Sequence, residues 1–234
     1  MFEEIGSAGS LTGSPLVRVL RLRDFRLLWI GQATSLLGDH FHFIAISWLV
    51  LQLTNDPLAL GMVLALGGVP RAIFTLIGGA ITDRFSPRTV MLLSDLGRLA
   101  LTLVLAVLVL TGAMQVWMFY GFALIFGVVS GFFLPASMAI LPTVTRPEEL
   151  QGGNALVQGS SQLVSFLGPM LAGGVIAWFA HFGAASTASP QLGVGVALLL
   201  DAATFAISVV TLWLIQARAA RQTGAAAAQQ DVWQ

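Results

Sequence analysis

Long apolar stretches, separated by short groups of turn-forming and charged residues, make up most of this chain. Crossing the bilayer hydrocarbon takes about 20 helical residues. The stretches show no sustained alternation of apolar and polar residues, which would be typical of membrane strands. The pattern therefore predicts an all-α membrane protein with six transmembrane helices, over residues 25–53, 58–81, 89–110, 115–140, 154–180 and 191–215.

The six helices are expected to form one bundle over residues 25–215, with a cytoplasmic segment at 1–24 and a disordered cytoplasmic tail at 216–234. Residues 16–26 mix apolar and basic side chains just before the first span, which predicts a short interfacial helix with arginines reaching toward lipid headgroups. A nucleic-acid-binding arm is the alternative. Four arginines beside a span already serve as anchors, so we expect the partner to be the lipid bilayer and no nucleic acid.

Composition leads to the same class of protein. Apolar residues make up 56% of the chain and charged residues only 9%, whereas a soluble domain has about a quarter of its residues charged. The chain has no cysteine, which excludes disulfides and thiolate metal sites. No phosphate-binding loop, nucleophile–base set or metal motif occurs, so the sequence gives no basis for enzyme activity, a metal or another cofactor.

The arginines predict the orientation in the membrane. Nine of the 11 precede the first span, lie in the second or fourth connection, or follow the sixth span, and the other connections carry none. Because cytoplasmic loops are enriched in basic residues, both termini are expected to be cytoplasmic.

Charged residues inside the spans are the candidate functional residues, because they are costly there and need partners. Asp39 and Arg71 lie at comparable depth in the first two spans, and we expect them to pair and line a central cavity. A purely structural pair between helices is the alternative. Asp39 is the better proton acceptor of the two, because arginine does not release its proton.

Asp201 in the sixth span has no basic neighbour on its own helix, so it is a second candidate proton site. It would be protonated, bonded to a Ser or Thr, or paired with Arg71. Asp95 and Arg98 are three residues apart and share a helix face, which predicts a self-contained ion pair.

His40 and His42 are two residues apart and therefore point to different faces of a helix, so they cannot share one metal. One of the two could join Asp39 in a polar patch, and His40 could titrate near neutral pH, with ordinary packing or cavity lining as the alternative. Gln162 is a further candidate cavity residue, together with Gln32 and Gln158.

Two stretches of the chain resemble each other. Leu92 to Asp95 in the third span corresponds to Leu198 to Asp201 in the sixth, and similar apolar residues follow at the same offset. Because the third and sixth spans run in opposite directions, this similarity fits two three-helix repeats of inverted topology.

The connection between the second and third spans reads G-x-x-x-D-R-x-S-x-R, from Gly79 through Asp83 and Arg84 to Arg88. This spacing resembles the helix 2–3 loop of the major facilitator superfamily. Further stretches in the same order resemble its efflux branch, which includes the enterobactin exporter and macrolide efflux proteins. They include Phe25 to Trp29, Ser35 to Asp39, Leu53 to Gly61, Leu134 to Ala136 and Asn154 to Leu156.

The fifth span contains Gly168-Pro169 and Gly173-Gly174, which resemble the antiporter motif of that superfamily. Three residues separate the two pairs here, where the family pattern has two, so the inference from this motif to proton exchange is weakened. The matching stretches correspond to the N-terminal six-helix half of such a transporter.

The resemblance implies alternating access, driven by proton exchange, that exports a small amphipathic molecule across a bacterial inner membrane. It also implies that Asp83 holds two six-helix halves together in one conformation, with Asp95 and Arg98 stiffening this gate. The partners would be the substrate and a second six-helix half, since the tail after Gln216 resembles a shortened linker. The alternatives are a non-transporting six-helix fragment or membrane partner protein, and a half-size transporter that acts as a dimer.

Overall fold

The computed structural model describes residues 15–182 and 191–215, and these residues are almost entirely helical. The predicted tail at 216–234 and the connection before the sixth span lie outside the described residues. In chain order the elements are α1 (Pro15–Leu20), α2 (Arg23–Thr54), α3 (Pro57–Arg84), α4 (Pro87–Leu110), α5 (Val116–Gly131), α6 (Phe133–Val144), the 3₁₀ helix η2 (Pro147–Glu149), α7 (Leu150–Phe182) and α8 (Gln191–Leu214).

Within the described residues, six helical segments are long and apolar enough to cross a membrane, with α5 and α6 together forming the fourth. The predicted fold class, an all-α membrane protein with six spans, is confirmed. Local chemistry fixes the helix starts: Pro57 and Pro87 occupy the first turns of α3 and α4, where no N–H is needed. Asp56 caps α3, since its Oδ1 accepts a 2.8 Å hydrogen bond from the backbone N–H of Leu58.

The fourth span differs from the single helix predicted over 115–140. It breaks at Phe132 and continues as α6 to Val144, so Pro142 lies inside a helix and not in a connection. The break follows from Pro135, which has no N–H for the carbonyl of Gly131 and whose ring crowds that carbonyl.

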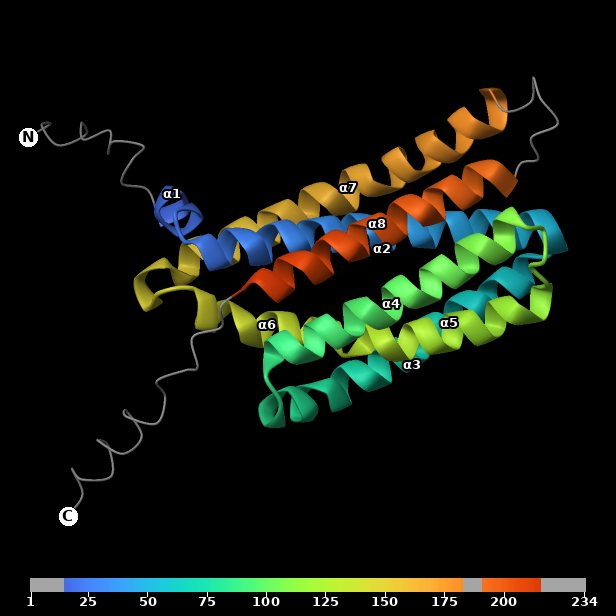
Figure 1. The fold of residues 1–234 in the computed structure, drawn as a ribbon. Helices are drawn as coiled ribbons and strands as arrows, with labels where there is room; N and C mark the ends of the chain where they lie inside the picture. The colour runs from blue at the N-terminus through green and yellow to red at the C-terminus, as the bar shows by residue number, and fades with distance from the viewer. Residues whose placement is uncertain (1–14, 183–190, 216–234) are drawn as a thin grey trace, which may run out of the picture.

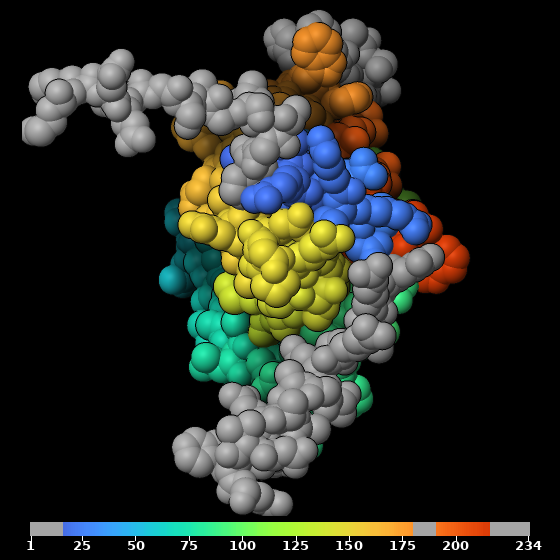
Figure 2. Space-filling model, turned by 90° about the vertical axis from the view of Figure 1, so that its left-hand side faces the viewer, coloured from blue at the N-terminus to red at the C-terminus, as the bar shows by residue number. Residues whose placement is uncertain are grey.

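The basic stretch at 16–26 also differs from the prediction of one helix. A turn at Arg21 and Leu22 separates α1 from α2, and residues 23–26 belong to α2. Side chains of this region are buried against the bundle: Val19 and Phe25 are fully buried. Figure 2 shows α1 and the start of α2 covering one end of the bundle beside the segment that includes η2.

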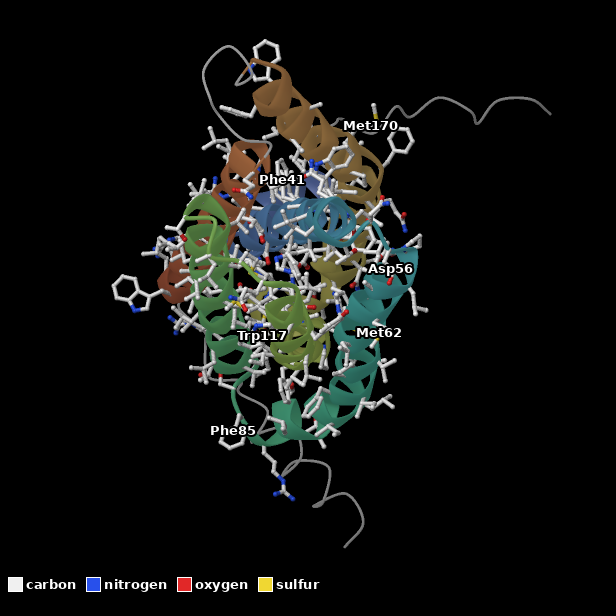
Figure 3. The ribbon with its side chains drawn as sticks, turned by 90° about the vertical axis from the view of Figure 1, so that its right-hand side faces the viewer. Phe41, Asp56, Met62, Phe85, Trp117 and Met170 are labelled. Carbon is white, nitrogen blue, oxygen red and sulfur yellow. The ribbon has the colours of Figure 1, made fainter. Side chains whose placement is uncertain are left out.

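The bundle is built around α8, which lies between α2 and α4 (Figure 1). Half of the most apolar stretch of α8 is buried, compared with 6% for α3. The outward faces of α3 and α7 carry large apolar side chains, and Met170 of α7 projects away from the bundle while Phe41 of α2 lies inside (Figure 3). These outer faces suit contact with lipid or another apolar surface.

Two hydrogen bonds join α4 and α8 reciprocally. Ser208 donates from its Oγ to Asp95 Oδ2 at 2.5 Å, and Thr102 donates from its Oγ1 to Asp201 Oδ2 at 3.4 Å. Asp95 lies 106 positions before Asp201, and Thr102 lies 106 positions before Ser208, so the two bonds join equivalent positions of the two helices. The two antiparallel helices are thus related as the inverted repeat predicts.

The connection between α3 and α4 is held through Arg88. Its Nε donates to the carbonyl of Leu212 at 2.8 Å and its Nη2 to the carbonyl of Trp213 at 2.6 Å. Arg88 therefore supplies a positive charge and two donors to the last turn of α8, where carbonyls lack helical partners. Asp83 and Arg84 are exposed at the end of α3.

Replacing Arg88 with glutamine is expected to destabilise the end of α8 by about 1–2 kcal/mol, because two charge-assisted hydrogen bonds are lost. Hydrogen exchange measured by mass spectrometry should show faster exchange in the peptide that contains Trp213. Arg84→Gln is the matched control, and equal exchange in the two variants would contradict a capping role for Arg88.

Candidate functional site

Arg98 of α4 is the centre of a buried group of charges. Its guanidinium is 1% exposed; Nη2 donates to Asp95 on the same helix, and Nη1 lies 3.2 Å from Asp39 Oδ1 on α2. The rings of Phe133 and Phe205 contact the guanidinium, with centroids 4.3 and 4.6 Å from its central carbon. These contacts anchor Arg98 to four helices: α2, its own α4, α6 and α8.

Two predicted pairings are corrected by this arrangement. Asp39 pairs with Arg98, and the predicted pairing of Asp39 with Arg71 was wrong. The pair of Asp95 and Arg98 forms as predicted, but it is not self-contained, because Asp39 and Ser208 also join it.

Gly38 explains why Asp39 turns toward α4 and α8. A Cβ at Gly38 would lie 2.0 Å from Thr204 Oγ1 and 2.6 Å from Asp201 Oδ1. The missing side chain lets α2 approach α8 closely, as small residues do at helix interfaces in membranes. This approach sets the rotation of α2 and places Asp39 beside Arg98.

Asp201 lies in a second part of the same buried group. It is fully buried, and its Oδ2 is 3.2 Å from His42 Nδ1 and accepts the hydrogen bond from Thr102. The imidazole of His42 stacks on Phe126 of α5 at 3.9 Å between centroids. Of the three alternatives left open for Asp201, pairing with Arg71 is not observed, whereas a threonine contact is.

The sequence left open which of the two histidines joins the acids, and only His40 was named as a candidate site residue; in the structure the histidine that contacts an acid is His42. The spacing of three residues between Asp39 and His42, which places both side chains on one helix face, is the signal that favours His42. His40 instead packs against Gly168 of α7, where a Cβ would lie 2.7 Å from His40 Cδ2. The packing interpretation therefore describes His40.

The residues of the α7 motif have different surroundings. Gly168 gives α7 room against α2, and Pro169 lies within the helix. A Cβ at Gly173 or Gly174 would meet nothing within 4 Å. These two glycines thus leave part of α7 smooth and open.

Arg71 lies midway along α3 and faces two cavities that it shares with Asp39. One, of about 280 Å³, is also lined by His42 and Phe126. The other, of about 420 Å³, is more polar, and its lining includes Gln32, Ser137, Asn154, Gln158 and Ser161. Gln162 is exposed and does not line either cavity.

The charges of this group do not balance. Asp39, Asp95 and Asp201 are three carboxyl groups, whereas Arg98 is the one guanidinium that touches any of them among the described residues. Buried charges require compensation, so such a group is suited to bind protons. No group of three or more metal-ligating side chains with suitable geometry occurs within residues 15–182 and 191–215.

Comparison with known proteins agrees with the geometry. The sequence model of the transmembrane secretion effector family, of the major facilitator superfamily, matches residues 14–225. Among curated relatives, the uncharacterised transporter YfiS of Bacillus subtilis is 30% identical over 156 residues, which cover 65% of this chain and 36% of the relative. Macrolide efflux protein A of Streptococcus pyogenes is 29% identical over 144 residues, covering 60% of this chain and 36% of the relative.

The uncharacterised transporter YvqJ of Bacillus subtilis is 24% identical over 142 residues, covering 61% of this chain and 34% of the relative. The matched part of this chain thus spans about a third of the length of these relatives. The family match covers all of the helices described above. This six-span membrane chain therefore belongs to the transmembrane secretion effector family of the major facilitator superfamily.

Proposed function

We propose that the chain forms one half of a secondary transporter that exports a small amphipathic organic molecule in exchange for protons. The observation that carries this proposal is the unbalanced group of buried and half-buried acids beside two cavities that Asp39 and Arg71 line. Asp39 belongs to the group of acids and to the walls of both cavities, because it pairs with Arg98 and lines each cavity. Binding or release of a proton in the group of acids therefore changes the electrostatic field inside the substrate space.

A second six-helix unit completes the substrate space. Arg71 is exposed near the middle of a span, and a guanidinium there is costly unless it faces protein or water. The largely exposed faces of α3 and α7 flank the cavities and would meet that unit. The unit is a separate chain, further sequence or a second copy, and the membrane is the bacterial inner membrane with both termini cytoplasmic.

Export is the direction favoured by likeness to macrolide efflux protein A. Asp83 and Arg84, which are exposed at the end of α3, would contact the second unit at the cytoplasmic gate. Arg88 would keep that loop in position through its bonds to α8.

Inside-out vesicles from the cells that naturally contain the chain, which also supply any second unit, provide the test when they are compared with vesicles from cells that lack the chain. With an acidic interior, we expect the vesicles to accumulate radiolabelled erythromycin or Hoechst 33342, and a protonophore should abolish accumulation. Asp39→Asn should slow accumulation at least about tenfold, equivalent to about 1.4 kcal/mol, while the protein still folds because Asp95 keeps its contact with Arg98.

Arg146→Gln, which changes an exposed arginine outside the cavities, is the control for altered charge. Accumulation of both probes equal to that of vesicles from cells that lack the chain would contradict transport by this chain. That outcome would favour a membrane partner protein.

A further inference from the structure

We propose that the coupling proton binds to the pair formed by His42 and Asp201, and that it enters from the cavity through the His42 ring. This inference deepens the proposed function, on which its role in transport rests. The binding of the proton itself can be measured separately.

Asp201 is the carboxyl group of the buried set that lacks an arginine. Asp39 and Asp95 both contact Arg98, whereas the described contacts of Asp201 Oδ2 are the hydroxyl of Thr102 and the ring of His42. Its Oδ1 is buried and has no hydrogen-bond partner. A buried carboxylate in this situation requires a proton, on itself or on the neighbouring imidazole.

The surrounding charges favour one proton on this pair. Asp39 lies on α2, Asp95 and Arg98 on α4, and Arg71 reaches the shared cavity from α3. The nearby contributions of α5 and α6 are the uncharged rings of Phe126 and Phe133, and His40 on α2 turns to Gly168 of α7. Three carboxylates and the Arg98 guanidinium sum to −2; Arg71, which shares the cavity without touching the acids, offsets one of these charges, so one proton on the pair makes the set neutral.

His42 connects Asp201 with the cavity. Asp201 is fully buried, while the side chain of His42 is 15% exposed and lines the cavity together with Asp39 and Arg71. Its Nδ1 faces the carboxylate, which leaves Nε2 for a proton from cavity water. Stacking on Phe126 holds the ring in this orientation.

The transfer balances in one step. Nε2 takes a proton from a hydronium ion, so the His42 ring becomes imidazolium beside the Asp201 carboxylate, and the pair gains one proton and one positive charge. Release returns the proton to water, and no electrons are exchanged. The loaded pair then carries no net charge beside the close contact of Gly38 with α8.

Nuclear magnetic resonance of the full chain in lipid nanodiscs, with ¹³C,¹⁵N-labelled histidine, tests this assignment. The chain has three histidines, so His40→Gln, His42→Gln and His181→Gln assign every imidazole signal. We expect the His42 ring to gain a proton as the pH is lowered from 9 to 5. Asp201→Asn should weaken its proton affinity at least about tenfold, or one pH unit, because an adjacent anion stabilises imidazolium.

Asp95→Asn is the matched control, since it removes a buried carboxylate at the equivalent repeat position that does not touch His42. It should shift the His42 titration less than Asp201→Asn does. A His42 ring with a constant protonation state, or one shifted equally by both variants, would overturn the proposal. Transport that persists with its proton dependence in His42→Gln would overturn the coupling role alone and leave the proposed function standing.

If the vesicles show no transport while the nuclear magnetic resonance titration links His42 to Asp201, the proton site stands and the proposed function fails. Native-like thermal unfolding of Asp201→Asn confirms that the shift arises in a folded protein. Asparagine preserves the shape and keeps an oxygen for Thr102, so this variant is expected to fold.

Discussion

Replacing Arg98 with glutamine should destabilise the folded chain by about 3–5 kcal/mol, the usual cost of removing one partner from a buried ion pair. The change leaves Asp39 and Asp95 without a cation and removes the guanidinium from between Phe133 and Phe205. Thermal unfolding in detergent micelles, followed by tryptophan fluorescence, measures the effect.

A triple variant separates lost charge pairing from lost packing. Arg98→Met combined with Asp39→Asn and Asp95→Asn removes all three charges while keeping similar side-chain volumes. It should be clearly more stable than Arg98→Gln, because no uncompensated charge remains. If the two variants unfold at the same temperature, the charged group does not determine stability and Arg98 acts mainly through its bulk.

Replacing Gly127 with alanine is expected to disrupt the contact between α3 and α5, even though alanine favours helix by up to about 1 kcal/mol. The new Cβ would lie 2.2 Å from the carbonyl oxygen of Gly67 and 3.0 Å from its carbonyl carbon. Backbone atoms cannot move aside like a side-chain end, so the helices must separate, at a cost of about 1–3 kcal/mol.

Gly121 supplies the control on the same helix, because a Cβ there meets nothing within 4 Å. Gly121→Ala should leave the unfolding temperature unchanged or raise it, while Gly127→Ala lowers it. A similar unfolding temperature for both variants would mean that α3 and α5 do not pack as closely as described.

The spans could be predicted because their signal is local. Length and hydropathy identify a membrane helix, and proline and Asp56 mark where α3 begins. The break at Phe132 was missed although its cause, Pro135, is also local. A long apolar run conceals a proline kink unless the carbonyl four residues earlier is considered.

The charged pairs were harder to predict because depth in the membrane does not determine the rotation of a helix. Asp39 and Arg71 lie at similar depth and share two cavities, yet the cation that touches Asp39 is Arg98. That choice depends on the close approach at Gly38, which is a property of the packed bundle. The spacing of residues along one helix therefore does not determine which cation pairs with Asp39.

The matched positions of α4 and α8 differ in one residue that decides how each acid is used. Position 98 carries arginine, whereas the corresponding position 204 carries threonine. Asp95 therefore lies beside a permanent cation, and its counterpart Asp201 lies beside a histidine, whose charge depends on pH. A single basic residue is thus enough to give two equivalent carboxyl groups different tasks, one as a fixed support of the bundle and the other as part of a proton site.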